Sequence, residues 1–163
     1  MKNNLALAVT VMGLAGSVLA QEAVFQTKSL TPETALLAAK AAMELCRKQG
    51  YQVAVAVVDR AGLTQVLLRD RFAGAHTQEV AVNKAWTAAS FKTSTAVLAN
   101  ETQAGKPLSG LRNLPKFMAV AGGLVLEGGG TMFGAIGVSG APGETDEVCA
   151  KAGIKAIAEG LEF

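Results

Sequence analysis

A glycine-dotted run near the carboxyl end constrains the fold of this chain more than any other segment. It reads GAIGVSGAPGETDEVCAKAG and spans residues 134–153. Its apolar first half predicts a strand, in which Gly134, Gly137 and Gly140 let another backbone come closer than a Cβ would allow. Its second half predicts a helix that begins after Thr145, which is expected to be the N-cap. A strand, a tight turn and a helix therefore follow one another here without a linker.

The spacing of these glycines does not match a nucleotide-binding loop. G-x-x-G-x-x-G differs from G-x-G-x-x-G, and no Lys-Ser or Lys-Thr pair follows it as in a P-loop. The strand is also the last of the chain, whereas a Rossmann unit carries its glycine loop after the first strand. We interpret the run as a closely packed strand and turn, with one wall of a pocket for a flat ligand as the alternative.

The first 20 residues have the pattern of a secretory signal peptide. Lys2 supplies the positive charge, residues 5–14 are apolar, and the small-residue pattern VLA ends at Ala20. We expect cleavage after Ala20 and a single domain over residues 21–163, which is periplasmic or secreted. The apolar stretch is shorter than the roughly 20 residues of a membrane-spanning helix, so stable membrane insertion is not expected.

Composition narrows the class of function. The chain has 15 Lys and Arg against 13 Asp and Glu, and no basic run is interleaved with aromatic residues. Nucleic-acid binding is therefore not expected. Half of the residues are hydrophobic while the net charge is close to zero, a combination that favours self-association and predicts a homo-oligomer.

The chain contains two cysteines, Cys46 and Cys149. No C-x-x-C or C-x-x-C-H pattern occurs, which argues against thioredoxin chemistry and covalent attachment of c-type haem. Both cysteines fall in predicted helices, where we expect two buried free thiols. A disulfide is the alternative, because an exported protein meets oxidising conditions.

The pattern of apolar residues and breakers predicts the order helix, two strands, one or two helices, three strands and helix. Helices are expected between Thr31 and Gly50, from about residue 76 to 91, over 94–101 and after 145. Strands are expected over residues 53–58, 63–69, 117–121, 124–127 and 131–139. Short connections imply antiparallel pairing, and the segregation of helices from strands indicates an α+β fold.

His76 is the only histidine and stands at the start of the second predicted helix. No Cys or carboxylate partners lie at the spacing of a zinc site, and no Ser-His-Asp or Cys-His arrangement is evident. Haem iron needs only one axial imidazole, so a haem ligand is the attractive functional interpretation. An ordinary surface or capping histidine is the alternative.

Several motifs occur in an order that identifies a family. They are VVDRAG at 57–62, FAGAHT at 72–77, AVNKAWTA at 81–88, GAIGVSG at 134–140 and DEVCAKAG at 146–153. In these motifs the chain resembles the GlcG/HbpS-like haem-binding family, which includes the C-terminal domain of PduO-type corrinoid adenosyltransferases. The resemblance covers nearly all of residues 30–160.

The resemblance implies a profilin-like α+β domain with a five-stranded antiparallel sheet flanked by helices, assembled into a homo-oligomer. It also implies haem as the ligand, with a corrinoid as the alternative. Because the family includes members of unknown role, a protein that binds no cofactor is a further alternative. The residues expected at the ligand are His76 on the iron and, around it, Thr77, Lys84, Arg112, Lys116, Gly137 and Gly140.

The leading functional hypothesis is an exported, non-catalytic haem-binding protein that stores, senses or delivers haem. The cations among these residues would pair with the haem propionates. A second hypothesis is an enzyme that acts on a small organic ligand in the same cleft, with Asp59, His76, Glu79 and Lys84 as acid–base candidates. A third is an accessory structural oligomer that binds no ligand.

Overall fold

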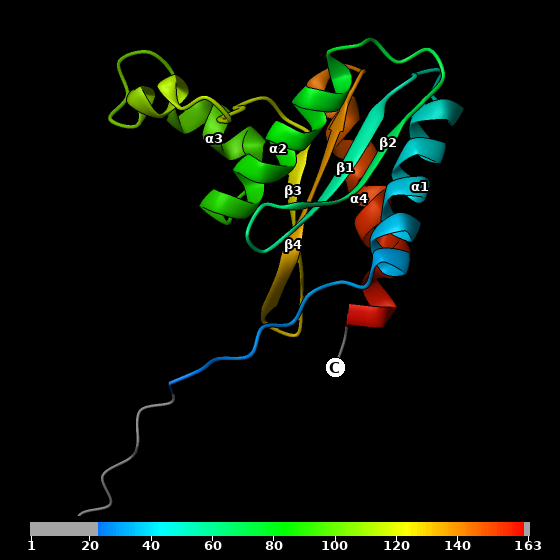
Figure 1. The fold of residues 1–163 in the computed structure, drawn as a ribbon. Coiled ribbons are helices and arrows are strands. Elements are labelled where there is room, and N and C mark those ends of the chain that lie inside the picture. The colour runs from blue at the N-terminus through cyan, green and yellow to red at the C-terminus, as the bar shows by residue number, and fades with distance from the viewer. Residues whose placement is uncertain (1–22, 162–163) are drawn as a thin grey trace, which may run out of the picture.

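The computed structural model describes residues 23–161, so the predicted signal peptide lies outside the described residues. Its centre is an antiparallel sheet of four strands in the order β2-β1-β4-β3 (Figure 1). The strands are β1 (Ala54–Asp59), β2 (Thr64–Arg69), β3 (Gly123–Gly128) and β4 (Thr131–Ser139). The predicted α+β class and antiparallel pairing are confirmed, whereas the sheet has four strands and not the five expected.

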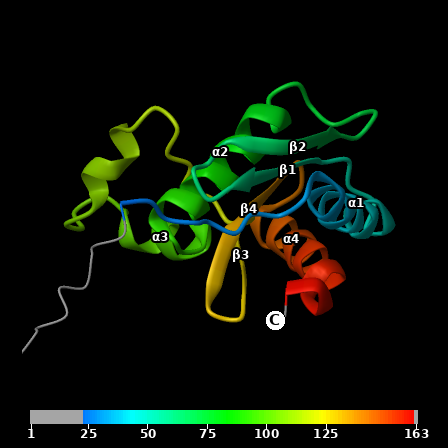
Figure 2. The same cartoon turned by 60° about the horizontal axis from the view of Figure 1, so that its bottom comes forward.

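Helices cover both faces of this sheet (Figure 2). One face packs against α1 (Pro32–Lys48) and α4 (Gly143–Ile157), and the other packs against α2 (Thr77–Phe91). Figure 1 shows that α3 (Thr95–Glu101) and the short 3-10 helix η1 (Ser109–Asn113) project from the α2 side. The described part of the chain ends with the 3-10 helix η2 (Ala158–Leu161) beside α4.

The strand β1 has one row of side chains in each of two hydrophobic clusters, because successive side chains of a strand point to opposite faces. Val55 and Val57 join the cluster beneath α1 and α4, whereas Ala54 and Ala56 join the cluster beneath α2. All four side chains are fully buried. The smaller alanines on the α2 side let that helix lie close to the sheet.

Small residues and a disulfide join α1 to α4. A Cβ on Gly153 would lie 2.7 Å from the carbonyl oxygen of Ala38, so the two helices approach more closely there than a larger residue would permit. Cys46 and Cys149 form a disulfide with a Cα–Cα distance of 5.7 Å. The expectation of two free thiols is therefore wrong. The cause is tertiary: the two helices pack face to face and bring together cysteines that lie 103 residues apart.

An ion pair adds to the closure of the α1 side. Arg47, in the last turn of α1, donates from Nε to Asp70 Oδ2 at 2.6 Å and from Nη2 to Asp70 Oδ1 at 2.8 Å. Asp70 is buried, and the guanidinium hydrogen bond holds the pKa of its carboxyl below the ordinary value. This bidentate contact fastens α1 to the end of β2.

The segment 117–121, predicted as a strand, is an irregular stretch that runs along α2. Thr87 on α2 replaces a neighbouring strand as its hydrogen-bond partner. Its hydroxyl accepts from the Met118 amide at 2.9 Å and donates to the Lys116 carbonyl at 3.3 Å. Phe117 packs edge-to-face on Phe91, with ring centroids 5.3 Å apart. The apolar run therefore reflects burial against a helix.

The start of α4 also differs from the prediction. Pro142 is the N-cap and the helix begins at Gly143, so Thr145 lies inside its first turn. The extended backbone of Pro142 turns the chain directly from β4 into the helix, which places the turn 139–142 at one end of the sheet.

No helix within residues 23–161 has the length and apolar character needed to cross a membrane.

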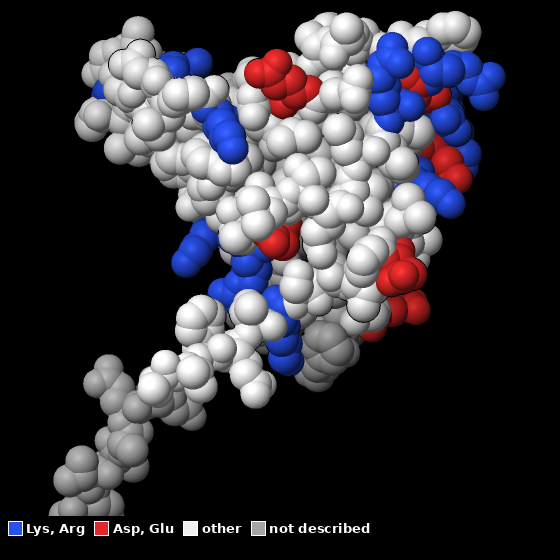
Figure 3. Space-filling model, viewed as in Figure 1, with Lys and Arg blue, Asp and Glu red and all other residues white. Residues whose placement is uncertain are grey.

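The charged residues are unevenly spread over the face drawn in Figure 3. Lys and Arg alternate with Asp and Glu along the edge formed by α1, while the broad centre of this face is largely uncharged. The basic side chains visible elsewhere on it stand in small separate groups.

Candidate functional site

A cavity of about 310 Å³ lies between the start of α2 and the turn from β4 into α4. Four of the residues predicted at the ligand line it. The complete lining is Gly74, His76, Thr77, Val80, Lys84, Val120, Ser139, Gly140, Ala141 and Asp146. The cavity is open to solvent at the His76 side, because His76 and Gly74 are both exposed.

His76 occupies the N-cap position of α2, but its side chain makes no capping hydrogen bond. The imidazole lies instead over Gly74, where an added Cβ would be 2.8 Å from its Cε1 and 3.0 Å from its Nδ1. Thr77, which is buried, fixes this turn by donating its hydroxyl to the Gly74 carbonyl at 2.7 Å. The local sequence thus presents an exposed imidazole on a rigid turn.

Lys84 lies two turns further along α2, at the buried end of the cavity. Its Nζ donates to Asp146 Oδ2 at 2.8 Å and to the Val138 carbonyl at 2.9 Å. Burial lowers the pKa of Lys84 and raises the pKa of Asp146, since each charge has lost its water. Asp146 balances the charge of Lys84, the one lysine or arginine in the described lining.

The two predicted glycines have different surroundings. Gly140 lines the cavity, and its φ of +142° belongs to the region that favours glycine. Gly137 is closed off, because a Cβ there would collide with the Ala81 carbonyl and lie 2.6 Å from the Ala85 amide of α2. Gly137 therefore sets the distance between β4 and α2, while Gly140 contributes to the cavity wall.

Two predicted cations lie outside the cavity lining. Arg112 donates to the carbonyls of Thr102 at 2.7 Å and of Ala99 at 3.1 Å, so it fastens η1 to the end of α3. Lys116 has its Nζ 6.0 Å from the centre of the Trp86 ring. Neither residue joins His76 in the structure.

The acid–base candidates of the enzyme hypothesis are dispersed as well. Asp59 accepts from the amides of Ala61 and Leu63 at 2.8 and 2.9 Å, which makes it the residue that orders the β1–β2 turn. Glu79 is exposed on α2 and is absent from the cavity lining. Only His76 and Lys84 of the four candidates line the same cavity.

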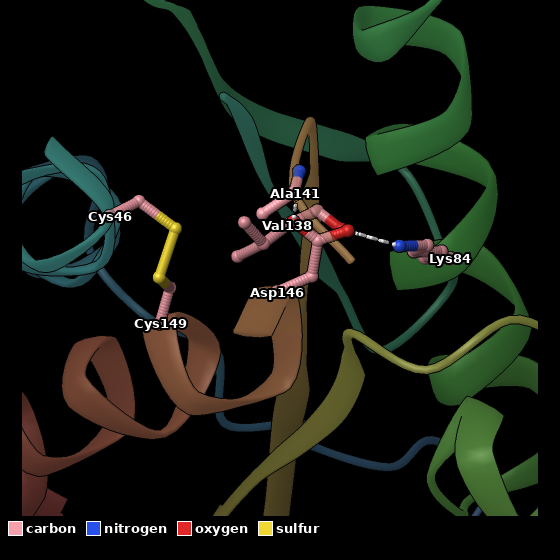
Figure 4. Close-up of a disulfide and its surroundings, with 6 residues drawn as sticks. All are labelled: Cys46, Lys84, Val138, Ala141, Asp146 and Cys149. Atoms are coloured by element: carbon pink, nitrogen blue, oxygen red, sulfur yellow. Dashed lines mark hydrogen bonds and ion pairs between the residues drawn. A yellow bond between two sulfur atoms is a disulfide. The ribbon is translucent and has the colours of Figure 1, made fainter. Parts of the chain in front are cut away.

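Asp146 is the site residue that the sequence reasoning missed. It lies in the first turn of α4, where the helix dipole is an ordinary explanation for an acidic residue. In the structure its side chain is 2% exposed, and its Oδ1 also accepts from the Ala141 amide at 3.0 Å (Figure 4). An available signal was its place three residues before Cys149, which puts both residues on one buried face of the helix.

The donor set fits haem better than a protein-bound metal ion. No group of three or more His, Cys, Asp and Glu side chains converges within the described part of the chain. An exposed imidazole on a rigid turn suits an iron that already carries four porphyrin nitrogens.

A second hollow of about 660 Å³ between α3 and α4 adjoins the cavity, since Val120 lines both.

Comparison with known proteins agrees with these features. A family model described as haem degrading protein HbpS-like matches residues 30–155. The chain belongs to this HbpS-like family. By sequence, it is 35% identical over 120 residues to the corrinoid adenosyltransferase PduO of Salmonella typhimurium, covering 72% of this chain. Those residues amount to 36% of PduO, so the HbpS-like chain corresponds to about a third of that relative's length.

Two solved structures extend the comparison to three dimensions. A double mutant of Streptomyces reticuli HbpS has a TM-score of 0.78 and 36% identity, and the match covers 95% of this chain and 99% of that one. A complex of PduOC with haem has a TM-score of 0.75 and 33% identity, and covers 79% of this chain and 95% of that one. The described fold is therefore shared with HbpS and with PduOC, and the PduOC structure is a complex with haem.

Proposed function

We propose that this protein is an exported haem-binding protein in which His76 is the axial ligand of the iron. The observation that carries the proposal is the imidazole itself. It is exposed, makes no capping bond, and stands at the mouth of a cavity next to a larger hollow. Membership of the HbpS-like family and the haem complex of PduOC support the choice of haem.

The chain's own residues would divide the work of binding. His76 would supply a neutral imidazole nitrogen, and Thr77 and Gly74 would hold the turn that carries it. The glycine wall at Gly140 leaves room for a flat ring against the backbone. Since Asp146 already balances Lys84, this lysine would not be free to pair with the haem propionates.

The test is a haemin titration of the mature protein followed by its absorption spectrum. We expect a Soret shift with wild type, and about a tenfold or greater loss of affinity with His76→Ala. Lys40→Ala is the control, because Lys40 is exposed on α1, at the other face of the sheet, and its loss should leave the spectrum unchanged. An identical spectrum and affinity in His76→Ala would remove His76 from the iron.

The non-catalytic role, in storage, sensing or delivery, belongs to the same proposal. Haem degradation is the second candidate, because the matching family model carries that description. Bound haem kept with a reductant in air distinguishes the two: a stable Soret band supports binding alone, and progressive bleaching supports degradation. A parallel titration with cobalamin tests the corrinoid alternative that the PduO relative suggests.

A profilin-like fold of the domain, its assembly into a homo-oligomer and a periplasmic or secreted location complete the proposal. The support for export is the signal-peptide pattern that ends at Ala20. Amino-terminal sequencing of the protein from its native host tests it, with Gln21 as the expected first residue. Light scattering with and without haemin measures the oligomer.

A further inference from the structure

The outward face of α4 carries a line of exposed side chains, which we call the α4 stripe. Its members recur at intervals of four, three and four residues, a spacing that places side chains on one line along a helix. They are Glu144, Val148, Lys151 and Lys155, all of which are exposed. The opposite face of α4 is buried against the sheet and α1, so the stripe is the surface that this helix presents to solvent.

The charges of the α4 stripe are ordered along the helix. Glu144 lies in the first turn and Lys155 in the last, and neither has an ion-pair partner within residues 23–161. Between them, Lys151 is paired with Glu147 at 2.7 Å, which leaves the middle of the stripe locally neutral. The stripe therefore has an unpaired acid at one end, a neutral centre and an unpaired base at the other end.

The α4 stripe also forms one wall of the hollow of about 660 Å³ between α3 and α4. The rest of the lining comes from α3 and the segment 119–121, and most of it is alanine: Ala96, Ala99, Ala119 and Ala121. Small side chains allow another helix to approach, since the axes of packed helices are about 8–10 Å apart. The hollow thus leaves room for a helix beside α4.

We propose that the α4 stripe is a docking surface for the same stripe of a second copy of this chain, with the two helices antiparallel. This inference rests on the proposed homo-oligomer and names the face through which it forms. A twofold axis at the midpoint of the stripe uses one patch on both copies, as a symmetric dimer requires. It brings Glu144 of each copy to Lys155 of the other, and Val148 to the methylene stem of Lys151.

The order of the charges selects both the occupant and its direction. In a parallel pair, Glu144 would face Glu144 and Lys155 would face Lys155, whereas the antiparallel pair joins opposite charges at both ends. An anionic membrane surface or a nucleic acid would be repelled by the unpaired Glu144. The α4 stripe is therefore complementary to itself.

Sedimentation of the mature protein over a series of concentrations measures this association. Glu144→Lys makes both ends of the stripe basic and Lys155→Glu makes both ends acidic, so each variant should associate about tenfold more weakly than wild type, or weaker still. An equimolar mixture of the two variants should associate like wild type, because each basic end then meets an acidic end. Glu144→Lys/Lys155→Glu should also associate like wild type, since the exchange of charges keeps the pairs.

A control is needed because both substitutions oppose the dipole of α4 and lower the stability of the helix. The double variant opposes the dipole most strongly and is still expected to associate, so it separates helix stability from contact. Glu33→Lys/Lys48→Glu is the matched control, because these exposed residues occupy the first and last turns of α1. It should associate like wild type, and circular dichroism checks that each variant keeps its helices.

The outcomes separate this inference from the proposed function. Single variants that associate like wild type would overturn the inference, place the contact on another face and retain the homo-oligomer. A mixture that associates as weakly as its components would overturn the pairing of Glu144 with Lys155. A wild type that is monomeric at every concentration would overturn the inference together with the homo-oligomer and leave the α4 stripe to a different partner. Haem binding is decided separately, by the Soret titration.

Discussion

The two faces of the sheet differ in how they are closed. On the α1–α4 side, small residues let the helices pack closely, a disulfide joins them and a bidentate ion pair fastens α1 to the end of β2. On the α2 side, alanines bring the helix close to the sheet, but the helix start is left open at a cavity with an exposed imidazole. One side therefore stabilises the domain, and the other offers a site.

The disulfide gives the largest expected effect on this comparison. Cys46→Ala/Cys149→Ala should lower the free energy of unfolding by about 4 kcal/mol, because the bond closes a loop of about 100 residues in the unfolded chain. Urea unfolding measures the change. Haemin affinity of the folded double variant serves as the control and should stay within about twofold of wild type. A loss of stability below about 1 kcal/mol would contradict the prediction.

Gly137→Ala should destabilise the packing of α2 on the sheet, because the added methyl group overfills the space between β4 and α2. The new Cβ would meet the Ala81 carbonyl and the Ala85 amide, so α2 must move away from β4. We expect a loss of about 3 kcal/mol in urea unfolding. Gly110→Ala is the matched control, because no atom lies within 4 Å of its Cβ position. Equal stability of the two variants would mean that α2 yields without cost.

The two ion pairs should change the stability of the protein in opposite directions as the pH falls, because the pKa of Asp70 is lowered and that of Asp146 is raised. The hydrogen bond from Arg47 lowers the pKa of Asp70, so the native state binds fewer protons than the unfolded chain. Its contribution is complete above the unfolded pKa of about 3.9 and is lost as the pH falls through the folded pKa. Arg47→Met should therefore flatten the acid limb of a stability-against-pH curve measured in urea.

The pair on the cavity side has the opposite dependence. The pKa of Asp146 is raised by burial, so its ionisation opposes folding as the pH rises from about 3.9 through its folded pKa. Lys84→Met/Asp146→Asn should remove this opposition and leave the Asp70 limb intact. The prediction would be contradicted if the double variant lost the fall in stability at acid pH while Arg47→Met kept it. That result would assign the acid dependence to Asp146 and not to Asp70.

Gly74→Ala should have the smallest effect on stability and a clear effect on the site. The added Cβ meets the movable imidazole of His76 and no backbone atom among its three nearest neighbours, so the ring rotates and the fold persists. We expect urea stability within about 0.5 kcal/mol of wild type. Haemin affinity should fall about tenfold, and an unchanged affinity would show that the imidazole needs no support from this turn.

Local pattern predicted much of this architecture, and the misses have a common cause. The valine run of β1, the glycine-dotted strand β4 and the helix start at His76 all follow from periodicity and breakers within a few residues. The partners of Lys84 and Cys46 lie 62 and 103 residues away, and only the packing of complete helices brings them together. The predicted strand over residues 117–121 was wrong for a similar reason. The Thr87 hydroxyl, which belongs to α2, takes the hydrogen bonds of the Met118 amide and the Lys116 carbonyl that a neighbouring strand would otherwise make.

The disulfide has a consequence for how the chain matures. Cys46 lies before the first strand and Cys149 after the last, so the covalent loop encloses the entire sheet. Native oxidation requires α1 and α4 to be aligned, and α4 is synthesised after all four strands. The bond is therefore expected to form late in biogenesis. The time at which it forms in a pulse-labelled chain would report when folding is complete.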